Sequence, residues 1–222
     1  VEDDAPSATQ TTATVTLPNV NTNILLTLDV SGSMTTTDGG GGKTRLQLMK
    51  ESVIGLLDGY DNLGDVRVRI VTFSTTAAEQ GTSWVDVATA KSIVNGLAAN
   101  GSTNYDASIS TAQSAFGDSG KLAGAQNVSY FLSDGEPNPA TSKIDPAAET
   151  TWTNFLSTND VKSFSFGMGT GATQAALDPI AYDGLNNTNT NGVVVSDITQ
   201  LPPILRDSVV APTVGNVIGG GL

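Results

Sequence analysis

Segments typical of buried strands alternate with segments typical of helices along most of this chain. Residues 23–29 form an almost unbroken apolar run, as expected for a strand that is covered on both faces. Further strand patterns lie at 66–73, 128–133, 161–167 and 193–195, with helical spacing of apolar residues between them. Strands that alternate with helices form a parallel sheet. The sequence therefore predicts a doubly wound, Rossmann-like α/β fold, in which helices cover both faces of a mostly parallel central sheet.

Some finer expectations concern single segments. Apolar residues at helical spacing over 46–56 predict a helix that ends at Gly59. Residues 82–87 predict a short edge strand, and Phe164 is expected to be buried in a central strand. The two tryptophans lie in segments with apolar periodicity, so we expect them in the core rather than on a ligand-binding surface.

The two ends of the chain are typical of connecting segments. Residues 1–21 are acidic and rich in threonine, which predicts a linker or an edge strand from a preceding module. Residues 22–210 form the predicted domain, and the glycine-rich residues 211–222 a C-terminal linker. Because the chain begins at Val1 with no signal-type segment, we expect it to be one module of a longer protein.

The composition excludes several kinds of chemistry. The 222 residues include no cysteine and no histidine, so disulfides, thiolate or imidazole metal sites and catalytic groups built on either residue are ruled out. A bound metal must be held by oxygen, which favours magnesium, calcium or manganese. The net charge of −12 repels nucleic acids and anionic membrane surfaces. We therefore expect no nucleic-acid binding. No run of 18 apolar residues occurs, so we also expect no membrane insertion. The abundance of Thr, Ser, Asn and Gly favours an extracellular, surface-exposed protein.

Side chains with oxygen atoms follow two of the predicted strands. Alternate residues of an extended segment point the same way, so Asp29, Ser31 and Ser33 can present three oxygens to one point. Asp134 follows the strand at its own carboxyl end, and Thr103 lies in a glycine turn that opens a helix. Each alone has a simpler explanation as a turn or cap residue. Because parallel strands end at one edge of a sheet, we expect the loops that carry these oxygen ligands to lie at one edge, where they are harder to dismiss together.

Three segments of the chain resemble the signatures of the von Willebrand factor type A domain. They are NILLTLDVSGSM at 23–34, GSTNYDA at 101–107 and YFLSDGEPN at 130–138. The resemblance implies the fold of that family and its metal-ion-dependent adhesion site, with one divalent cation. It implies that Ser31, Ser33 and Thr103 coordinate the cation through hydroxyls, and that Asp29 and Asp134 act directly or through water.

The resemblance also implies a function in binding. An open coordination position would take a carboxylate of a partner protein or another surface ligand, and we expect Met34, Asn104, Tyr105 and Glu136 at the rim that faces this ligand. The acidic, threonine-rich ends add a narrower resemblance to the type A module of bacterial RTX adhesins. It implies a role in cell adhesion and biofilms, with neighbouring modules of the same adhesin as further partners.

Two other functions remain open. The domain could be a structural spacer whose cation only stabilises the loops, or an enzyme that handles phosphate. Residues 39–44 (GGGGKT) imitate a phosphate-binding loop, but Thr37 replaces the required first glycine and the preceding strand ends too early. The sequence shows no activated nucleophile, so we expect that the protein is not an enzyme. We interpret residues 39–44 as a connector that opens a helix. Asp38 in the connector and Asp61 in a later turn are expected to lie outside the cation site.

Overall fold

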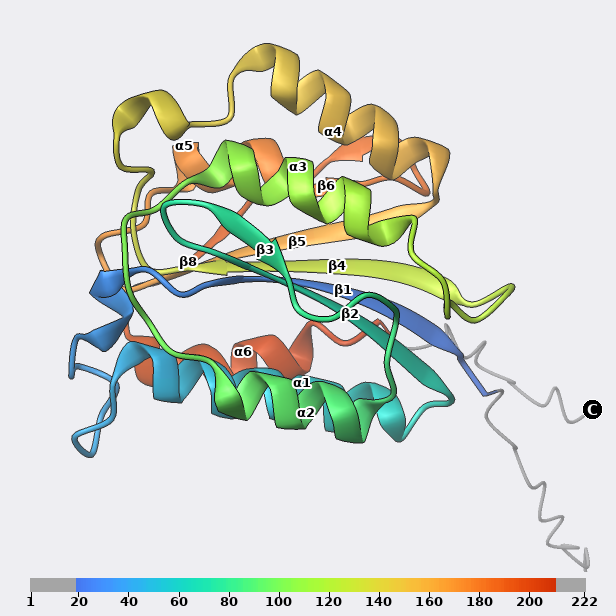
Figure 1. The fold of residues 1–222 in the computed structure, drawn as a ribbon, viewed down its shortest axis with the longest axis horizontal. Helices are drawn as coiled ribbons and strands as arrows, with labels where there is room; N and C mark the ends of the chain where they lie inside the picture. The colour runs from blue at the N-terminus through green and yellow to red at the C-terminus, as the bar shows by residue number, and fades with distance from the viewer. Residues whose placement is uncertain (1–18, 211–222) are drawn as a thin grey trace, which may run out of the picture.

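Strand β1 (Thr22–Asp29) lies inside an eight-stranded sheet in the computed structural model, which describes residues 19–210. It pairs in parallel with β2 (Val66–Phe73) and with β4 (Gln126–Ser133), and β4 pairs in parallel with β5 (Val161–Met168). The order across the sheet is β3-β2-β1-β4-β5-β6-β7, and β8 pairs with β5. The predicted doubly wound α/β fold with a mostly parallel sheet is confirmed (Figure 1).

Short strands complete the two sides of the sheet. Strand β3 (Ala77–Glu79) is antiparallel to β2, and β6 (Tyr182–Asp183) is antiparallel to β5. Strand β7 (Thr188–Asn189) pairs antiparallel with β6, and β8 (Val193–Val195) runs parallel to the end of β5. The long parallel strands are therefore protected at both sides of the sheet by short antiparallel ones, which offer little free edge for unwanted pairing.

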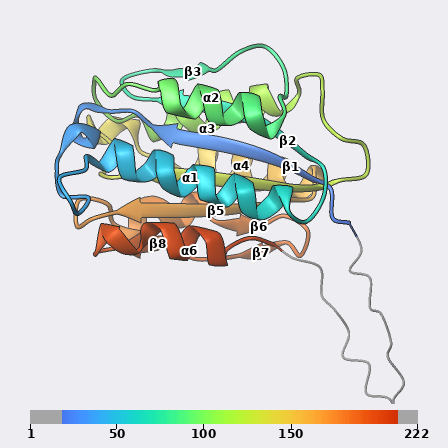
Figure 2. The ribbon, with the colours of Figure 1, turned by 90° about the horizontal axis from the view of Figure 1, so that it is seen from below.

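Helices form a layer on each face of the sheet (Figures 1 and 2). One face carries α1 (Arg45–Asp61), α2 (Val87–Gly96) and α6 (Leu201–Asp207). The opposite face carries α3 (Tyr105–Phe116), α4 (Pro146–Thr158) and α5 (Gln174–Leu177). Single turns of 3-10 helix lie at Gly32–Thr35, Ala140–Ser142, Asp178–Ile180 and Ile198–Gln200.

The apolar core is divided by the sheet into two clusters. Ile24, Leu26 and Leu28 of β1 point to the layer of α1, α2 and α6, and Leu25 points to the layer of α3 and α4. All four side chains are fully buried. A strand covered on both faces gains from apolar side chains at every position, which explains its unbroken apolar run. Both tryptophans are buried, as expected.

The sequence was misleading at two segments. Helix α1 continues through Gly59 to Asp61, and a Cβ at Gly59 would lie 3.0 Å from Cγ2 of Val209. This glycine therefore permits close packing and does not end the helix. The expected edge strand at 82–87 is also wrong: the edge strand is β3, and only Val85 forms an isolated bridge there. Asp86 instead caps α2 by accepting a hydrogen bond from the Thr89 amide, which commits the following residues to a helix.

Phe164 is half-buried, less than expected for a central strand. The cover over this part of β5 is incomplete, because helix α6 has only seven residues. The neighbouring Lys162, on the same face of β5, lines a cavity described below. The expected linkers and the N-terminal edge strand lie outside the described residues, and the boundaries at 22 and 210 stay predictions. None of the helices within residues 19–210 combines the length and hydropathy that crossing a membrane requires.

We predict that Arg69→Ala costs about 3 kcal/mol of unfolding free energy. The Arg69 side chain is fully buried, and its guanidinium donates to Asp118 (2.7 Å) and Glu79 (2.5 Å) and to two backbone carbonyls. Its removal leaves two carboxylates without their counter-charge. Urea unfolding at pH 7 measures the change.

The exposed pair of Arg206 and Asp207 provides the control, because its atoms lie 3.8 Å apart and the two side chains are 67% and 76% exposed. Arg206→Ala is expected to change stability by less than about 0.5 kcal/mol. Equal effects of the two substitutions would show that Arg69 has no special structural role.

Candidate metal centre

Three loops meet at the edge where the parallel strands end. The first loop, residues 30–44, connects β1 to α1, and the second loop, residues 97–104, connects α2 to α3. The third loop, residues 134–145, connects β4 to α4. Because β1 and β4 run parallel and end side by side, the first and third loops leave the sheet next to each other.

Backbone hydrogen bonds fix the second loop between the other two. The Gly32 amide donates to the Gly101 carbonyl (2.8 Å), and the Asn138 amide donates to the Thr103 carbonyl (2.8 Å). A Cβ at Gly32 would approach the Gly101 oxygen to 3.3 Å, so this contact favours glycine. The positive φ of 89° at Gly101 also suits glycine. The three loops are therefore held in one arrangement by the main chain.

Asp29 is a fully buried acid at this edge. Its carboxylate accepts hydrogen bonds from the Ser31 amide (2.7 Å) and from the Ser133 hydroxyl (2.5 Å). The hydroxyl of Ser31 lies 3.0 Å from that of Ser33. The end of β1 thus presents one carboxylate and two hydroxyls in a continuous chain of hydrogen-bonded groups.

Asp134 completes the arrangement from the third loop. Its Oδ1 accepts a hydrogen bond from the Ser33 hydroxyl (2.7 Å), and its Oδ2 accepts one from Nη1 of Arg45 (2.9 Å). The Asp134 side chain is fully buried. The Ser33–Asp134 hydrogen bond joins the first and third loops directly, across 101 residues of sequence.

The structure gathers the predicted ligand residues at this edge. Asp29, Ser31, Ser33 and Asp134 are linked by the hydrogen bonds above, and Thr103 is buried on the second loop, whose backbone bonds to both other loops. We call these five residues the oxygen cluster. Ser33 is exposed whereas the other four are buried, so the cluster opens to solvent at Ser33.

Two of the four residues expected at a ligand-facing rim do not lie there. Met34 and Tyr105 are fully buried, so the expectation is wrong for both. The Tyr105 hydroxyl donates to the Gly135 carbonyl (2.6 Å) and so supports the third loop from below. Asn104 is partly exposed and caps α3, and Glu136 is exposed. A role of these two at the rim stays a prediction.

Sequence reasoning missed three polar residues at this edge. Ser133 donates to Asp29, and its position beside Asp134 at the end of β4 is a signal that could have indicated it. Arg45 and Asp38 form a bidentate ion pair (2.7 Å), and Arg45 also contacts Asp134. Asp38 thus lies outside the cluster, as expected, but only the Arg45 side chain separates it from Asp134.

The last two residues of the glycine connector, Lys43 and Thr44, both have partners in α1. Nζ of Lys43 pairs with Glu51 of α1 at 2.6 Å, and both side chains are about half exposed. The Thr44 hydroxyl accepts from the Gln47 amide and caps α1. This confirms that the segment opens a helix. Asp61 is exposed and lies outside the cluster, as expected, but it is the last residue of α1 rather than a turn residue.

The electrostatics of the cluster favour an additional positive charge. Burial raises the pKa of Asp29 from 3.8 to about 6, despite the hydrogen bonds from Ser133 and Ser31, and the nearby charge of Asp134 adds to this rise. Within residues 19–210 no group of three or more acidic, His or Cys side chains could hold a metal. The cluster instead offers two carboxylates and three hydroxyls. Such an all-oxygen set fits a hard divalent cation such as magnesium or calcium.

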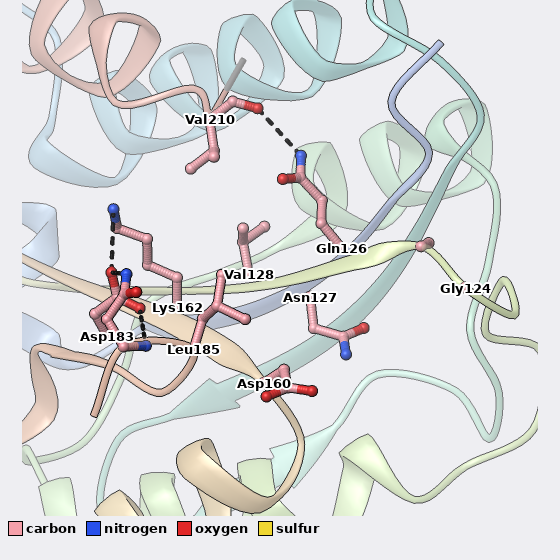
Figure 3. Close-up of a pocket in the computed structure, with 11 residues that line it drawn as sticks. Gly124, Gln126, Asn127, Val128, Asp160, Lys162, Asp183, Leu185 and Val210 are labelled. Atoms are coloured by element: carbon pink, nitrogen blue, oxygen red, sulfur yellow. Dashed lines mark hydrogen bonds and ion pairs between the residues drawn. The ribbon is translucent and has the colours of Figure 1, made fainter. Parts of the chain in front are cut away.

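A cavity of about 460 Å³ lies at the opposite edge of the sheet (Figure 3). Its lining includes Gln126 at the start of β4, Lys162 of β5 and Val210. Lys162 faces Asp183 across 3.6 Å, and the Gln126 side chain donates to the Val210 carbonyl. Lys162 and Asp183 are thus paired with each other, as are Gln126 and the Val210 carbonyl. The cavity is remote from the oxygen cluster.

Comparisons with known proteins agree with the fold. The family model of the von Willebrand factor type A domain matches residues 24–136. A von Willebrand factor type A structure from Catenulispora acidiphila is 23% identical, with a TM-score of 0.64 over 85% of this chain and 41% of that one. Proximal thread matrix protein 1 from the mussel byssus, with a zinc-occupied MIDAS motif, is 20% identical, with a TM-score of 0.65 over 86% and 45%.

A more distant structure is the PilB minor pilin from Streptococcus sanguinis, which is 14% identical with a TM-score of 0.59 over 85% of this chain and 60% of that one. This chain spans less than half the length of the first two structures. A search of curated protein sequences gives no match.

We predict that the cation-free protein becomes more stable as the pH falls from 7 to 5. The pKa of Asp29 is about 6 in the folded state and near 3.8 when unfolded, so the folded state binds more protons between these values. The expected contribution of Asp29 is about 1 kcal/mol over this pH range. Urea unfolding in excess chelator measures it.

Asp29→Asn is the control, because the amide carries no charge at either pH. Between pH 7 and pH 5, the unfolding free energy of this variant should rise by about 1 kcal/mol less than that of the wild type. Parallel pH profiles of the two proteins would contradict a raised pKa at Asp29.

Proposed function

Since the family model covers half of its length, this chain is a member of the von Willebrand factor type A domain family, and we propose that it is a binding module that depends on a divalent cation. The observation that carries the proposal is the convergence of the oxygen cluster. Two carboxylates and three hydroxyls from the end of β1 and from three loops lie at one edge, and the loops are joined by the Ser33–Asp134 hydrogen bond and by main-chain bonds. The opening at Ser33 gives a partner access from solvent.

The residues of the cluster divide into two roles. The hydroxyls of Ser31, Ser33 and Thr103 would hold the cation without adding charge, and the carboxylates of Asp29 and Asp134 would balance its charge. A cation held in this way supplies an electrophilic centre that can accept one further oxygen ligand. We propose that this ligand is a carboxylate of a partner protein or of another surface molecule.

Magnesium, calcium or manganese is the proposed cation, because the donors are all oxygen. The occupied motif of the mussel protein supports a divalent ion at the equivalent edge of this fold. No catalytic role is proposed: the chain has no histidine or cysteine, and the Lys43 and Thr44 of the connector serve an ion pair and a helix cap.

The wider context is also part of the proposal. The acidic, threonine-rich segment at residues 1–21 favours a module within a large bacterial surface adhesin, of the RTX type, in the extracellular space. Neighbouring modules of the same chain would then flank the domain. The strongly negative net charge argues against partners that present nucleic acid or anionic lipid.

A structural spacer is the alternative function. In that case the cation would stabilise the three loops and bind no partner. The exposure of Ser33 favours the binding module, because a purely structural cation needs no opening to solvent.

We predict that millimolar magnesium or calcium raises the melting temperature and that a chelator lowers it. The cation would offset the repulsion between the buried carboxylates of Asp29 and Asp134. A cation at a hundredfold excess over its Kd adds about 2.7 kcal/mol. Scanning calorimetry measures the shift, and identical melting curves in chelator and in cation would contradict a cation site.

We predict that Ser31→Ala, Ser33→Ala and Thr103→Ala each weaken cation binding while the fold is kept, because each removes a ligand oxygen but no charge. Asp29→Ala should weaken binding more, since it also removes charge. Isothermal titration measures the affinities. Asp61→Ala is the matched control, because Asp61 is exposed at the far end of α1 and should leave the affinity unchanged.

The same variants separate the binding module from the spacer. A binding module should attach to a surface that presents glutamate side chains only when the cation is present, and Ser33→Ala should reduce this attachment. A spacer should show the thermal shift but no cation-dependent attachment.

A further inference from the structure

Arg45 places a positive charge directly on the oxygen cluster. It is the first residue of α1, and its amide donates to the Thr36 carbonyl (2.9 Å). Nη1 donates to Oδ2 of Asp134 (2.9 Å), so both oxygens of that carboxylate have a partner. The guanidinium also lies against Gly169 after β5, where a Cβ would approach Nη2 to 3.5 Å. Arg45 therefore bridges loops that follow β1, β4 and β5.

The Arg45 side chain is held in this position by Asp38. Nε and Nη2 donate to the two oxygens of Asp38 at 2.7–3.1 Å, which is a bidentate pair. The Arg45 side chain is only 15% exposed, whereas that of Asp38 is 43% exposed. The guanidinium is thus pre-positioned at Asp134 by a second carboxylate, and it cannot move away without losing both ion pairs.

The formal charges around the cluster indicate how Arg45 and Asp38 would affect cation binding. Asp29 and Asp134 carry a formal charge of −2, which matches a divalent cation. Arg45 opposes that attraction at short range and competes for Asp134, and Asp38 restores part of the lost negative charge from a more exposed position. At these separations the interactions are screened little by salt.

We propose that the Asp38–Arg45 pair sets the cation affinity of the oxygen cluster, with Arg45 weakening the binding of a divalent cation and Asp38 offsetting part of that effect. The proposal rests on the proposed cation site. In the cation-free protein Arg45 serves as the counter-charge of the buried Asp134. A divalent cation must therefore compete with a positive group that the chain itself provides, which keeps the site reversible.

A purely structural role for the pair makes a different prediction. If Arg45 and Asp38 only shaped the first loop, loss of either would disturb the cluster and weaken cation binding. A role through charge predicts opposite effects of the two substitutions, because their charges are opposite.

The test compares the wild type with Arg45→Gln, Asp38→Asn and the double variant, titrated separately with magnesium and with calcium. Arg45→Gln should bind about tenfold more tightly and Asp38→Asn about threefold more weakly, the smaller effect reflecting the exposure of Asp38. The double variant should bind about threefold more tightly than the wild type, because the two effects partly cancel. Arg45→Lys, which keeps the charge, should remain close to the wild type.

Melting in excess chelator gives a second, independent measurement. Arg45→Gln should melt at a lower temperature than the wild type, because the buried Asp134 loses its counter-charge, and should gain more from added cation. Lys43→Gln is the matched control: it removes a charge two residues away from Arg45, in an exposed pair that does not touch the cluster, and should change the affinity less than about twofold.

The outcomes separate this inference from the proposed function. Weaker binding by both single variants, or no change in either, would overturn the role of the pair while leaving the cation site intact. Binding by Arg45→Gln but not by the wild type at millimolar cation would support the role of Arg45 and overturn the proposed function of the natural chain. Absence of binding by both proteins would overturn both.

Discussion

The parallel pairing of β1 with β2 on one side and β4 on the other brings together the strand ends from which the two carboxylates of the candidate site come. Thr22 is in register with Val66 and with Gln126, so the three strands start together. They also end together, which places Asp29 beside Ser133 although 104 residues separate them in sequence. The hydrogen bond between these two side chains is possible only in this register. A shift of one residue would turn Asp29 towards the opposite face of the sheet.

The two carboxylates of the cluster are both buried, but they have different hydrogen-bond partners. Asp29 is satisfied only by neutral donors, the Ser31 amide and the Ser133 hydroxyl, and burial raises its pKa despite them. Asp134 has a guanidinium on one oxygen and a hydroxyl on the other. The cation-free cluster therefore keeps one negative charge without a direct counter-charge. A buried charge of this kind costs stability unless a proton or a cation compensates it, so folding and occupancy of the site are linked.

Sequence periodicity could predict the parts of this protein that depend on neighbouring residues. The buried strands follow from apolar runs, and Asp29, Ser31, Ser33 and Asp134 could be placed at one edge because they follow such strands. The Asp38–Arg45 pair could not be predicted, because its geometry depends on a connector in which Gly40, Gly41 and Gly42 all have positive φ. Gly59 was misinterpreted because its close contact with Val209 comes from a segment 150 residues later. Long-range contacts of this kind leave no local pattern.

The net charge of −12 and the local charges of the cluster act over different distances. An acidic partner is repelled by the whole domain at long range, but ions screen this repulsion beyond about 8–10 Å at physiological salt. Within that distance the proposed partner would meet the proposed cation and the guanidinium of Arg45, which lies 2.9 Å from Asp134. Arg45 would then have opposite effects on the two binding events, since it opposes the cation but favours a carboxylate. The strength of adhesion would therefore be determined by the balance of charges within a few side chains of Ser33 rather than by the charge of the domain.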